Sequence, residues 1–457
     1  MRYDVEHQRN IAFDLLRLKR YGISVREYFE KDESIIIYGL GFLGKELYWE
    51  LKEWVRIVCF MDRAHDQEFF DQVPVYSMDN TVVSDITRDH QKLTVVITVS
   101  QAWEDIAQTL SEKFPGSFVP VPFYAITADL KLKKTGFFSN KQPLALEIVQ
   151  DIFYNRPANI DRIVLVGTSY TWLLSLLMLD GWERTLYLAE RFFSAENVKK
   201  MTEHNIPCFY EEEAGEFYDI TYLIAAYAKR WNIPVYGHDH LFLSRAFLKN
   251  SITVIEDGGA NYNFKNAIIF KSILDSGEPY YPFGFHNYVD KIFLTGFKKI
   301  PEEISHKAEI IEPAALWNME DGRERQIISD LFSFPYEELK YLVEHGKTIL
   351  FLTEPYANMR GEDIISIRQM IEMYQEILAN YDKSQIIIKP HPSDCVDYKI
   401  WMPGYCVIGR QFPVQMISWT GMPLEKIILM HRSTCIQAFS GKYEIEECEE
   451  ILSKYGL

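Results

Sequence analysis

Short apolar runs alternate with helix-like segments along the chain. After a charged, helical lead-in at 11–31, the first part predicts strands and helices in alternation at 34–38, 45–54, 55–62, 93–99, 102–114 and 117–123. Such alternation is typical of a parallel α/β sheet. The pattern therefore predicts one α/β domain that ends near residue 125.

The same pattern starts again at Arg162 and once more at Lys347. The second pattern predicts a helix at 194–204 and strands at 162–167, 185–190, 219–228, 233–239 and 251–255. The third predicts strands at 347–355, 385–389, 405–409 and 426–430, helices at 362–381 and 413–419, and a closing helix at 444–454. We expect two successive Rossmann-like units behind the first domain.

These patterns divide the 457 residues into four segments. We predict an accessory Rossmann-like domain at 1–125, a polar and basic linker at 126–160, one lobe at 161–345 and a second lobe at 346–457. Polar motifs stand at the carboxyl ends of strands in both lobes, which is where open α/β sheets bind ligands. A ligand cleft between the two lobes is the expected consequence.

Charge and composition exclude several classes of protein. Lys and Arg number 48 against 65 Asp and Glu, a net charge of −17, whereas a nucleic-acid binder needs clustered positive charge. The chain is 47% hydrophobic and 14% aromatic, which is typical of a folded protein. We expect no nucleic-acid partner, and an anionic ligand would need a local site.

The six cysteines are scattered and form no Cys-x-x-Cys pair, which favours reduced thiols over disulfides or a zinc site. The first residues lack the layout of a secretory signal, and the most apolar stretch, 163–179, is interrupted by polar residues. We therefore expect a cytoplasmic protein without a transmembrane segment.

Gly39, Gly41 and Gly44 follow the first apolar run and open a helix, and Asp62 ends the next strand. Glycines at this spacing permit a tight turn and a close approach of backbone to phosphate, and the acid can accept from a ribose hydroxyl. The alternative is that the glycines serve only the packing of helix against strand. The motif is a candidate site for a nucleotide or nucleotide sugar.

Glu256, Asp257 and Gly258 follow the strand at 251–255. Adjacent carboxylates at a strand end place an acid at the edge of a cleft, where burial and the neighbouring charge can raise a pKa toward that of a general base. An Asp-Gly pair is also common in plain turns.

Lys389, Pro390, His391 and Pro392 follow the strand at 385–389. The prolines restrain the backbone and hold the imidazole at the strand end, where it can donate to a phosphate or protonate a leaving group. A structural histidine is the alternative.

Ser433 and Thr434 follow the strand at 426–430. Hydroxyl and N–H groups at such a turn can bind an anion or simply cap a helix. His238 and His240 have an H-x-H spacing, which without further ligands is more typical of structural histidines than of a metal site. We expect no bound metal ion.

The order of these motifs resembles the bacterial sialyltransferases of glycosyltransferase family 52 and, more loosely, the polysialyltransferase families. The resemblance covers about residues 160–445 and rests on EDG-x-A-N-Y, ILFLTEP, KPHP, FP-x-x-M and a Ser-Thr pair. It implies an α/β fold of GT-B type with two Rossmann-like lobes, CMP-sialic acid as donor substrate and no cofactor. It also implies inverting, metal-independent transfer to a hydroxyl of a glycan acceptor of the lipooligosaccharide or capsule type.

The resemblance implies roles for individual residues as well. Asp257 would be the general base and His391 the phosphate partner and acid. The implied donor site comprises Glu256, Gly258, Lys389, Pro392, Ser433 and Thr434. The chain departs from the family pattern at Gln415, where the family often has Glu after Phe-Pro, and in pairing a serine with a threonine.

Residues 1–125 lie outside that match and resemble the small Rossmann-like domain at the front of sugar O-acyltransferases, which can bind a nucleotide sugar. Nothing similar to the left-handed β-helix of those enzymes follows, so acyl transfer is not implied. Two alternatives stay open: a glycosyltransferase with another nucleotide-sugar donor, and a binding or regulatory protein with an inactive transferase half. Peripheral association with the inner face of a bacterial inner membrane and homo-oligomerisation also stay open.

Overall fold

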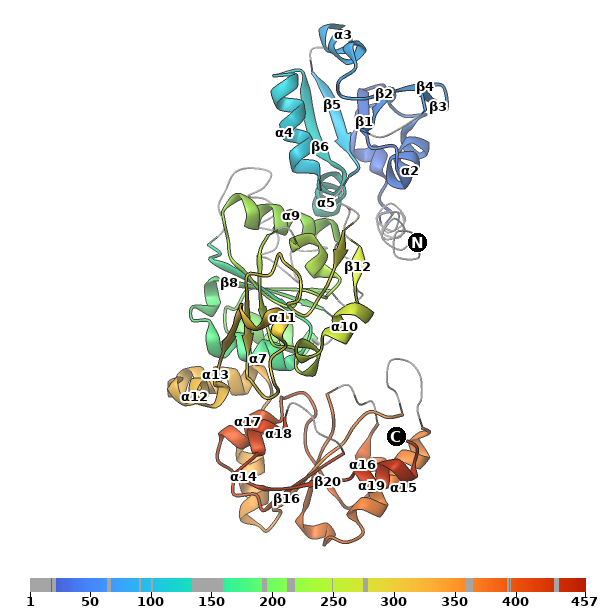
Figure 1. Ribbon diagram of the computed structural model, residues 1–457. Coiled ribbons are helices and arrows are strands. Elements are labelled where there is room, and N and C mark those ends of the chain that lie inside the picture. The colour runs from blue at the N-terminus through green and yellow to red at the C-terminus, as the bar shows by residue number, and fades with distance from the viewer. Residues whose placement is uncertain are drawn as a thin grey trace.

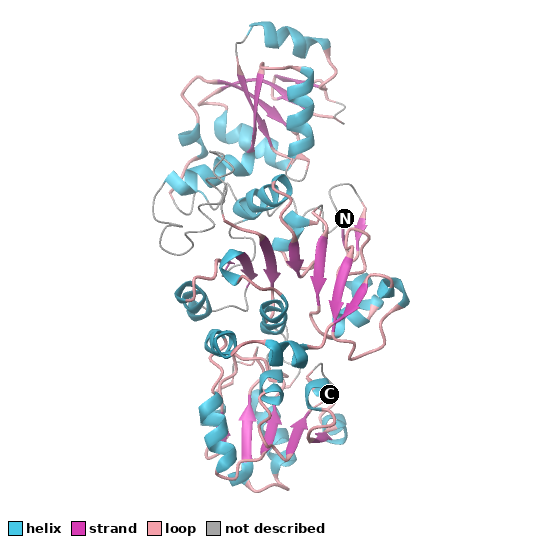
Figure 2. Cartoon of the chain, turned by 90° about the vertical axis from the view of Figure 1, so that its left-hand side faces the viewer, coloured by secondary structure: helices cyan, strands magenta, loops and turns pink. Residues whose placement is uncertain are grey.

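Three α/β units follow one another along the computed structural model and stack along its length (Figure 1). The structure describes residues 18, 22–63, 67–89, 92–99, 102–133, 159–190, 195–211, 218–248, 250–273, 278–357, 365–392, 394, 396–430 and 435–457. Each unit has a mainly parallel sheet against which its helices pack (Figure 2). The predicted fold class, two Rossmann-like α/β lobes behind an additional α/β domain, is confirmed.

The first unit holds a six-stranded sheet in the order β3-β4-β2-β1-β5-β6, in which only the β3–β4 pair is antiparallel. Its strands are β1 (Ser34–Tyr38), β2 (Arg56–Met61), β3 (Phe69–Phe70), β4 (Val73–Tyr76), β5 (Leu93–Ile97) and β6 (Phe118–Pro122). Its helices are η1 (Val25–Tyr28), α2 (Phe42–Leu51), α3 (Thr81–Asp89) and α4 (Trp103–Lys113). The predicted strands and helices from 34 to 123 are confirmed, and most of the lead-in at 11–31 lies outside the described residues.

Helix α5 (Phe123–Lys133) joins the first unit to the second (Figure 1). Phe123 and Ile126 pack into the core of the first unit, whereas Tyr124 and Ala128 belong to the core of the second. The prediction of a polar linker is therefore wrong for 126–133, because this helix buries apolar residues against both units. Residues 134–158 of the predicted linker lie outside the described part of the chain.

The second unit holds seven parallel strands in the order β15-β14-β11-β10-β7-β8-β9. They are β7 (Arg162–Val166), β8 (Thr185–Glu190), β9 (Cys208–Glu211), β10 (Val235–Gly237), β11 (Ile252–Ile255), β14 (Lys291–Leu294) and β15 (Ala308–Ile310). The helices are α7 (Ser169–Met178), η2 (Trp182–Arg184), α8 (Ala195–Glu203), α9 (Tyr218–Arg230), η3 (Leu243–Phe247), η4 (Gly259–Tyr262) and α10 (Phe264–Ile269). A small hairpin of β12 (Ser272–Ile273) and β13 (Pro279–Tyr280) lies beside them.

The strand predicted at 219–228 is wrong, because this segment belongs to helix α9. Residues 220–225, 227 and 228 are all buried, so the helix is covered almost all round and shows no single apolar face from which a helix could be predicted. The aromatic and β-branched residues of the segment therefore favoured a strand.

The third unit holds five parallel strands in the order β18-β17-β16-β19-β20. They are β16 (Ile349–Leu352), β17 (Ile386–Lys389), β18 (Cys406–Val407), β19 (Lys426–Leu429) and β20 (Glu444–Glu447). The helices are α15 (Ile367–Leu378), η5 (Lys383–Gln385), α16 (Tyr398–Trp401), α17 (Gln415–Trp419), α18 (Ile436–Phe439) and α19 (Glu449–Lys454). The closing helix predicted at 444–454 is wrong in its first half, since residues 444–447 pair with β19 at the sheet edge.

Three helices lead from the second unit to the third: α12 (Pro313–Met319), α13 (Gly322–Leu331) and α14 (Tyr336–Glu344). Helix α11 (Glu302–Ser305) lies between β14 and β15 and packs Ile304 into the core of the second unit. The three connecting helices complete one hydrophobic cluster shared by both units. The centre of the Phe332 ring lies 4.4 Å from the centre of the Trp172 ring in the second unit. The centre of the Phe334 ring lies 5.1 Å from the centre of the Phe412 ring in the third unit. The shared core sets the facing strand ends of the two lobes beside each other.

None of the helices in the described part of the chain combines the length and apolar character needed to cross a bilayer.

Candidate functional site

A cavity of about 440 Å³ lies where the second and third units meet. The second unit lines it with the start of α7, at 168–170, and with Asp257 after β11. The third unit lines it with the carboxyl ends of β16 and β17 and with the loop at 410–415. Its size and position fit a small-molecule site at the strand ends of two α/β sheets.

Four of the residues that the sequence placed in one site meet at this cavity: Asp257, Lys389, His391 and Pro392. Glu256 and Gly258 flank Asp257 in the chain, but neither lines the cavity. Ser433 and Thr434 lie outside the described residues.

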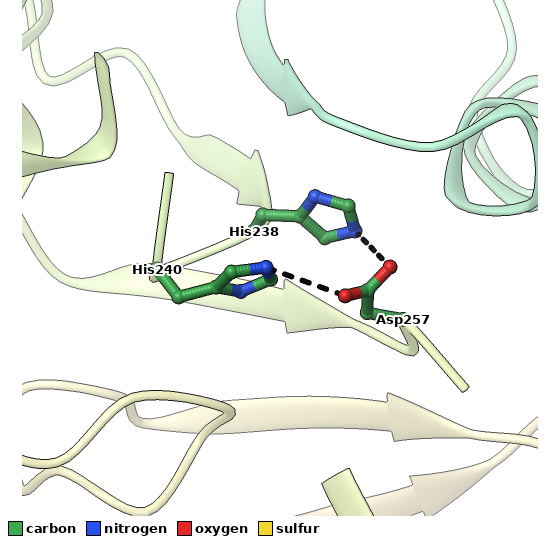
Figure 3. A group of neighbouring side chains, drawn as sticks. All are labelled: His238, His240 and Asp257. Atoms are coloured by element: carbon green, nitrogen blue, oxygen red, sulfur yellow. Dashed lines mark ion pairs between the residues drawn. The ribbon is translucent and has the colours of Figure 1, made fainter. Parts of the chain in front are cut away.

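Two histidines hold the Asp257 carboxylate (Figure 3). Asp257 Oδ1 lies 3.2 Å from His238 Nε2, and Oδ2 lies 3.3 Å from His240 Nε2. Burial by itself would raise the pKa of Asp257, but His238 and then His240 outweigh burial and lower that pKa well below its ordinary value. The prediction of a raised pKa at this carboxyl is therefore wrong, because its nearest titratable neighbours are imidazoles rather than a carboxylate.

The backbone and a hydroxyl fix the His238 ring. The Gly167 N–H donates to Nδ1 at 3.1 Å, so the proton of the ring is assigned to Nε2, which lies 2.6 Å from Thr171 Oγ1. The Thr171 hydroxyl in turn donates to the Glu256 carbonyl oxygen at 2.8 Å. The loop after β7 and the ends of β10 and β11 are thereby tied together beside Asp257.

His240 stands between two carboxylates. Its Nε2 faces Asp257, and its Nδ1 lies 3.9 Å from Asp239 Oδ1. Burial lowers the pKa of His240, but the two nearby carboxylates, Asp239 and Asp257, outweigh burial and raise it to about 9. At neutral pH His240 is therefore the positively charged partner of Asp257.

His238, His240 and Asp257 also form, among the described residues, a group whose ligand atoms lie within 4.8 Å of one another. In the arrangement observed, however, His238 Nδ1 accepts an N–H and His238 Nε2 carries a proton, so neither offers a lone pair to a metal. The contacts fit a hydrogen-bonded cluster of charges, and the expectation of no metal ion stays a prediction.

Glu256 lies beneath the cavity rather than on its wall. It is 0% exposed and accepts hydrogen bonds from Tyr262 Oη at 2.6 Å, the Thr295 N–H at 2.6 Å and Thr295 Oγ1 at 2.9 Å. Gly258 has a φ of 98°, which residues with side chains rarely adopt. Both residues fix the loop that carries Asp257, while their contact with a donor stays a prediction.

Thr353 and Asp394 fix the turn that carries His391. Thr353 Oγ1 accepts the His391 N–H at 3.1 Å and donates to Asp394 Oδ2 at 3.2 Å. Tyr398 Oη donates to the same carboxylate oxygen at 2.5 Å, and the Asp394 N–H donates to the His391 carbonyl at 3.0 Å. His391 is therefore carried by a braced turn on the cavity wall.

Lys389 is a buried cation beside the cavity. Its ammonium donates to the carbonyl oxygens of Pro390 at 2.9 Å and Arg410 at 3.0 Å, and lies 4.6 Å from the centre of the Phe412 ring. Burial lowers the pKa of Lys389 to about 7. An anion in the cavity would favour the charged form.

Sequence analysis missed two parts of the cavity wall. Thr168, Ser169 and Tyr170 line it at the start of α7, and Thr168 Oγ1 caps that helix by accepting the Thr171 N–H at 3.2 Å. The Gly-Thr-Ser sequence between a buried strand and an apolar helix was the available signal. Glu354, at the end of β16, also lines the cavity, and no role was assigned to it within the ILFLTEP motif.

The glycine motif of the first unit is used in packing. A Cβ atom on Gly44 would lie 1.9 Å from the Gly39 carbonyl oxygen, whereas one on Gly41 would meet nothing within 4 Å. Asp62 Oδ2 accepts the Leu40 N–H at 2.7 Å, so the acid predicted to bind a ribose closes the glycine turn. These contacts favour the packing alternative, and nucleotide binding here stays a prediction.

Comparison with known proteins places the second and third units in a family. The sequence model of glycosyltransferase family 52 matches residues 184–446, more than half of the chain. A Haemophilus influenzae protein described as uncharacterized is 29% identical over 227 residues, which is 49% of this chain and 72% of that protein.

Two crystal structures of sialyltransferases were also compared with the fold. The α/β-galactoside α-2,3-sialyltransferase of Photobacterium phosphoreum has a TM-score of 0.45 and 11% identity, over 63% of this chain and 90% of that one. The GT-B domain of the Photobacterium damselae sialyltransferase has a TM-score of 0.43 and 11% identity, over 62% and 90% of the two chains. Because the identity and the TM-score of both structures are this low, the assignment of the chain to a family rests on the match to the sequence model of glycosyltransferase family 52 alone.

Proposed function

Because the chain belongs to glycosyltransferase family 52, we propose that this glycosyltransferase moves sialic acid from CMP-sialic acid to a hydroxyl of a lipooligosaccharide or capsule-type glycan. The transfer would invert the anomeric centre and would need no metal ion. One observation carries the proposal: Asp257 of the second unit and His391 of the third line the same cavity. These are the two residues to which the family resemblance gives the base and the phosphate partner.

Asp257 would take the proton of the acceptor hydroxyl. His238 and His240 lower the pKa of Asp257, so the carboxylate is ionised throughout the neutral range. A weakly basic carboxylate is sufficient here, because the acceptor hydroxyl becomes strongly acidic as its oxygen bonds to the cationic anomeric carbon. The negative charge also stabilises that carbon as the donor bond breaks.

Lys389 and His391 would receive the donor phosphate on the opposite side of the reacting carbon. Both line the cavity from the third unit, and the family resemblance adds Ser433 and Thr434 to the phosphate site. Such a site depends on local cations, hydroxyls and N–H groups, so the net charge of −17 does not oppose it.

The test is release of CMP from CMP-sialic acid, measured with and without lipooligosaccharide and capsular oligosaccharides. We expect release that depends on acceptor, together with a sialylated product in the mass spectrum. Turnover with a different nucleotide sugar, and none with CMP-sialic acid, would reassign the donor. Binding of a nucleotide sugar without transfer to any acceptor would contradict the proposed activity.

A further inference from the structure

Three consecutive apolar side chains are exposed at the end of helix α10. Ile268 is 45% exposed, Ile269 68% and Phe270 49%. Single exposed apolar residues are ordinary on a folded protein, whereas a contiguous group of large ones marks an interaction site. We propose that this group, together with the flanking Lys265 and Lys271, is a docking surface for an anionic lipid bilayer. The inference goes beyond the proposed function, which concerns the donor and the acceptor hydroxyl.

The packing of α10 fixes which of its residues face outward. Ala267 is 0% exposed, and the centre of the Phe264 ring lies 5.2 Å from that of Phe285 in the core of the second unit. Lys265 and Ile269 are four positions apart, so they are neighbours on the opposite face of the helix. Figure 1 shows α10 at the outer edge of the second unit.

Lysines surround the apolar group. Lys265 and Lys271 flank it in the chain, and both are exposed. The loop at 297–299 adds two more exposed lysines and is held beside the start of α10, where the ring centres of Phe297 and Tyr262 lie 4.5 Å apart. Within the described part of the chain, none of these lysines has an ion pair with an acidic side chain. Their ammonium groups complement anionic lipid headgroups.

The net charge of −17 does not prevent binding to an anionic surface. Charges more than about 10 Å away are largely screened at 0.1 M salt, so the side chains nearest the bilayer decide. Glu302 and Glu303 follow the loop at 297–299 at the start of α11 and offset its two lysines in part. Lys265 and Lys271, which flank the isoleucines directly, therefore carry the charge contribution.

The composition of the group favours a bilayer over a protein partner. Lysine is depleted in protein–protein interfaces. A stable interface also buries about 800 Å² on each partner, far more than three side chains at the end of a short helix provide. Exposed apolar side chains ringed by lysines are instead typical of a protein that lies on an anionic bilayer. The apolar groups then enter the boundary between headgroups and acyl chains, and the ammonium groups stay at the phosphates.

A row of rings connects this surface to the proposed base. The centre of the Phe270 ring lies 5.8 Å from that of Phe283, which lies 4.5 Å from that of His240. His240 in turn pairs with Asp257, so the docking surface and the base belong to one packed region of the second unit. A glycan carried on a lipid would reach the base from the side that faces the bilayer. This last step rests on the proposed function, whereas the binding to lipid does not.

Sedimentation of the full-length protein with lipid vesicles, without donor or acceptor, tests the proposal. Wild type should bind vesicles made of an equal mixture of phosphatidylcholine and phosphatidylglycerol. The double variant Ile268→Gln/Ile269→Gln should bind them about 10- to 100-fold more weakly, because amides do not enter the apolar boundary. Met319→Gln is the matched control, since Met319 is 80% exposed but precedes Glu320 and Asp321. It should bind as wild type does.

Lys265→Gln/Lys271→Gln tests the charge contribution. Binding to the mixed vesicles should fall about tenfold or more, whereas binding to phosphatidylcholine alone should stay at the wild-type level. Lys92→Gln/Lys340→Gln, at exposed lysines of the first unit and of α14, changes the net charge equally and should keep the wild-type affinity for both kinds of vesicle.

Ile269→Trp shows which part of the protein meets the lipid. The variant keeps a large apolar side chain, so binding should persist, and brominated lipid should quench the fluorescence of the added indole. Wild type gives the background from the nine native tryptophans. Met319→Trp should gain no quenching above that background.

Three results would overturn the proposal: no binding of wild type to the mixed vesicles, wild-type affinity in Ile268→Gln/Ile269→Gln, or equal quenching in Ile269→Trp and Met319→Trp. If the isoleucine variant instead changed the oligomeric state without lipid and kept its vesicle binding, the group would be an interface between copies of the chain. Failure of the proposed function is distinguishable, because it would appear as absent CMP release and would leave vesicle binding unchanged.

Discussion

His238 and Asp257 stand at the ends of neighbouring parallel strands, with His238 Nε2 3.2 Å from Asp257 Oδ1. The register of β10 and β11 pairs Gly237 with Val254, so the residues that follow both strands emerge at the same edge of the sheet. The position of the proposed base is therefore set by backbone pairing, which is the kind of support that holds a reactive group accurately.

Asp257→Asn should abolish transfer and leave donor binding nearly intact. The amide keeps the size of the side chain but cannot accept the acceptor proton, so kcat should fall by about 10²- to 10⁴-fold. CMP release measures kcat, and calorimetric titration measures CMP affinity. Asp161→Asn is the control, since Asp161 pairs with Arg184 on the surface. Turnover within a few fold of wild type would exclude Asp257 as the base.

His240→Gln should make the activity sensitive to acid. His240 is one of the two histidines that lower the pKa of Asp257, so its removal should move that pKa back toward the ordinary range of Asp. We expect kcat/KM of the variant to fall on acidification at a higher pH than in wild type. His345→Gln, at an exposed histidine, should keep the wild-type profile. Coincident profiles for His240→Gln and wild type would contradict the electrostatic role.

His240 should also contribute to stability in a defined pH window. Its pKa is about 9 in the folded protein against 6.5 for the ordinary group, so folding favours the protonated form. The contribution is complete below pH 6.5 and is lost as pH rises through about 9. Thermal unfolding should show the midpoint of wild type falling over this window more steeply than that of His240→Gln. If the unfolding midpoints of the two proteins changed in parallel with pH, protonated His240 would add nothing to the stability of the fold.

Much of the fold can be predicted from the pattern of apolar and polar residues along the chain. Strands such as β7, β16 and β17 are buried along nearly their whole length, so each appears as an unbroken apolar run, as parallel strands covered on both faces do. Helix α9 was misassigned because its buried positions are aromatic and β-branched. Strand β20 was missed because its acidic sequence is typical of a helix end, and only pairing with β19 makes it a strand.

The sequence predicts less of the site than of the fold. Glu256 and Asp257 are adjacent at a strand end and equally acidic, yet one is buried among hydrogen-bond donors and the other lines the cavity. Which of the two faces outward depends on the pleat of β11 and on the turn at Gly258. The contact of Asp257 with His238 and His240 depends on β10 and β11 being neighbours in the sheet, and strand order is not visible in a linear sequence.

Gly44→Ala and Gly41→Ala should differ sharply in stability. A Cβ on Gly44 would lie 1.9 Å from the Gly39 carbonyl oxygen, so the helix and strand would have to separate at a cost of about 1–3 kcal/mol or more. Gly41 has open space at that position and should accept alanine with a much smaller loss. Urea unfolding, followed by a probe in the first unit, measures the free energy of unfolding of both variants. Equal losses would contradict the packing role assigned to Gly44.

Lys389→Met should weaken CMP binding and remove a proton linkage. The pKa of Lys389 is about 7 in the free protein, and a bound phosphate would raise it, so CMP binding should take up a proton above that pH. The affinity should therefore fall as pH rises from about 7 to 9, a range above the second phosphate pKa of about 6. The carboxyl group of Glu354 also loses its proton in this pH range. The protein with Lys389 and the Lys389→Met variant are therefore compared in a background in which both carry Glu354→Gln. Methionine fills the space of the lysine stem, and an unchanged unfolding midpoint would verify the fold. A Kd for CMP that rises equally with pH in both proteins would remove Lys389 from the phosphate site.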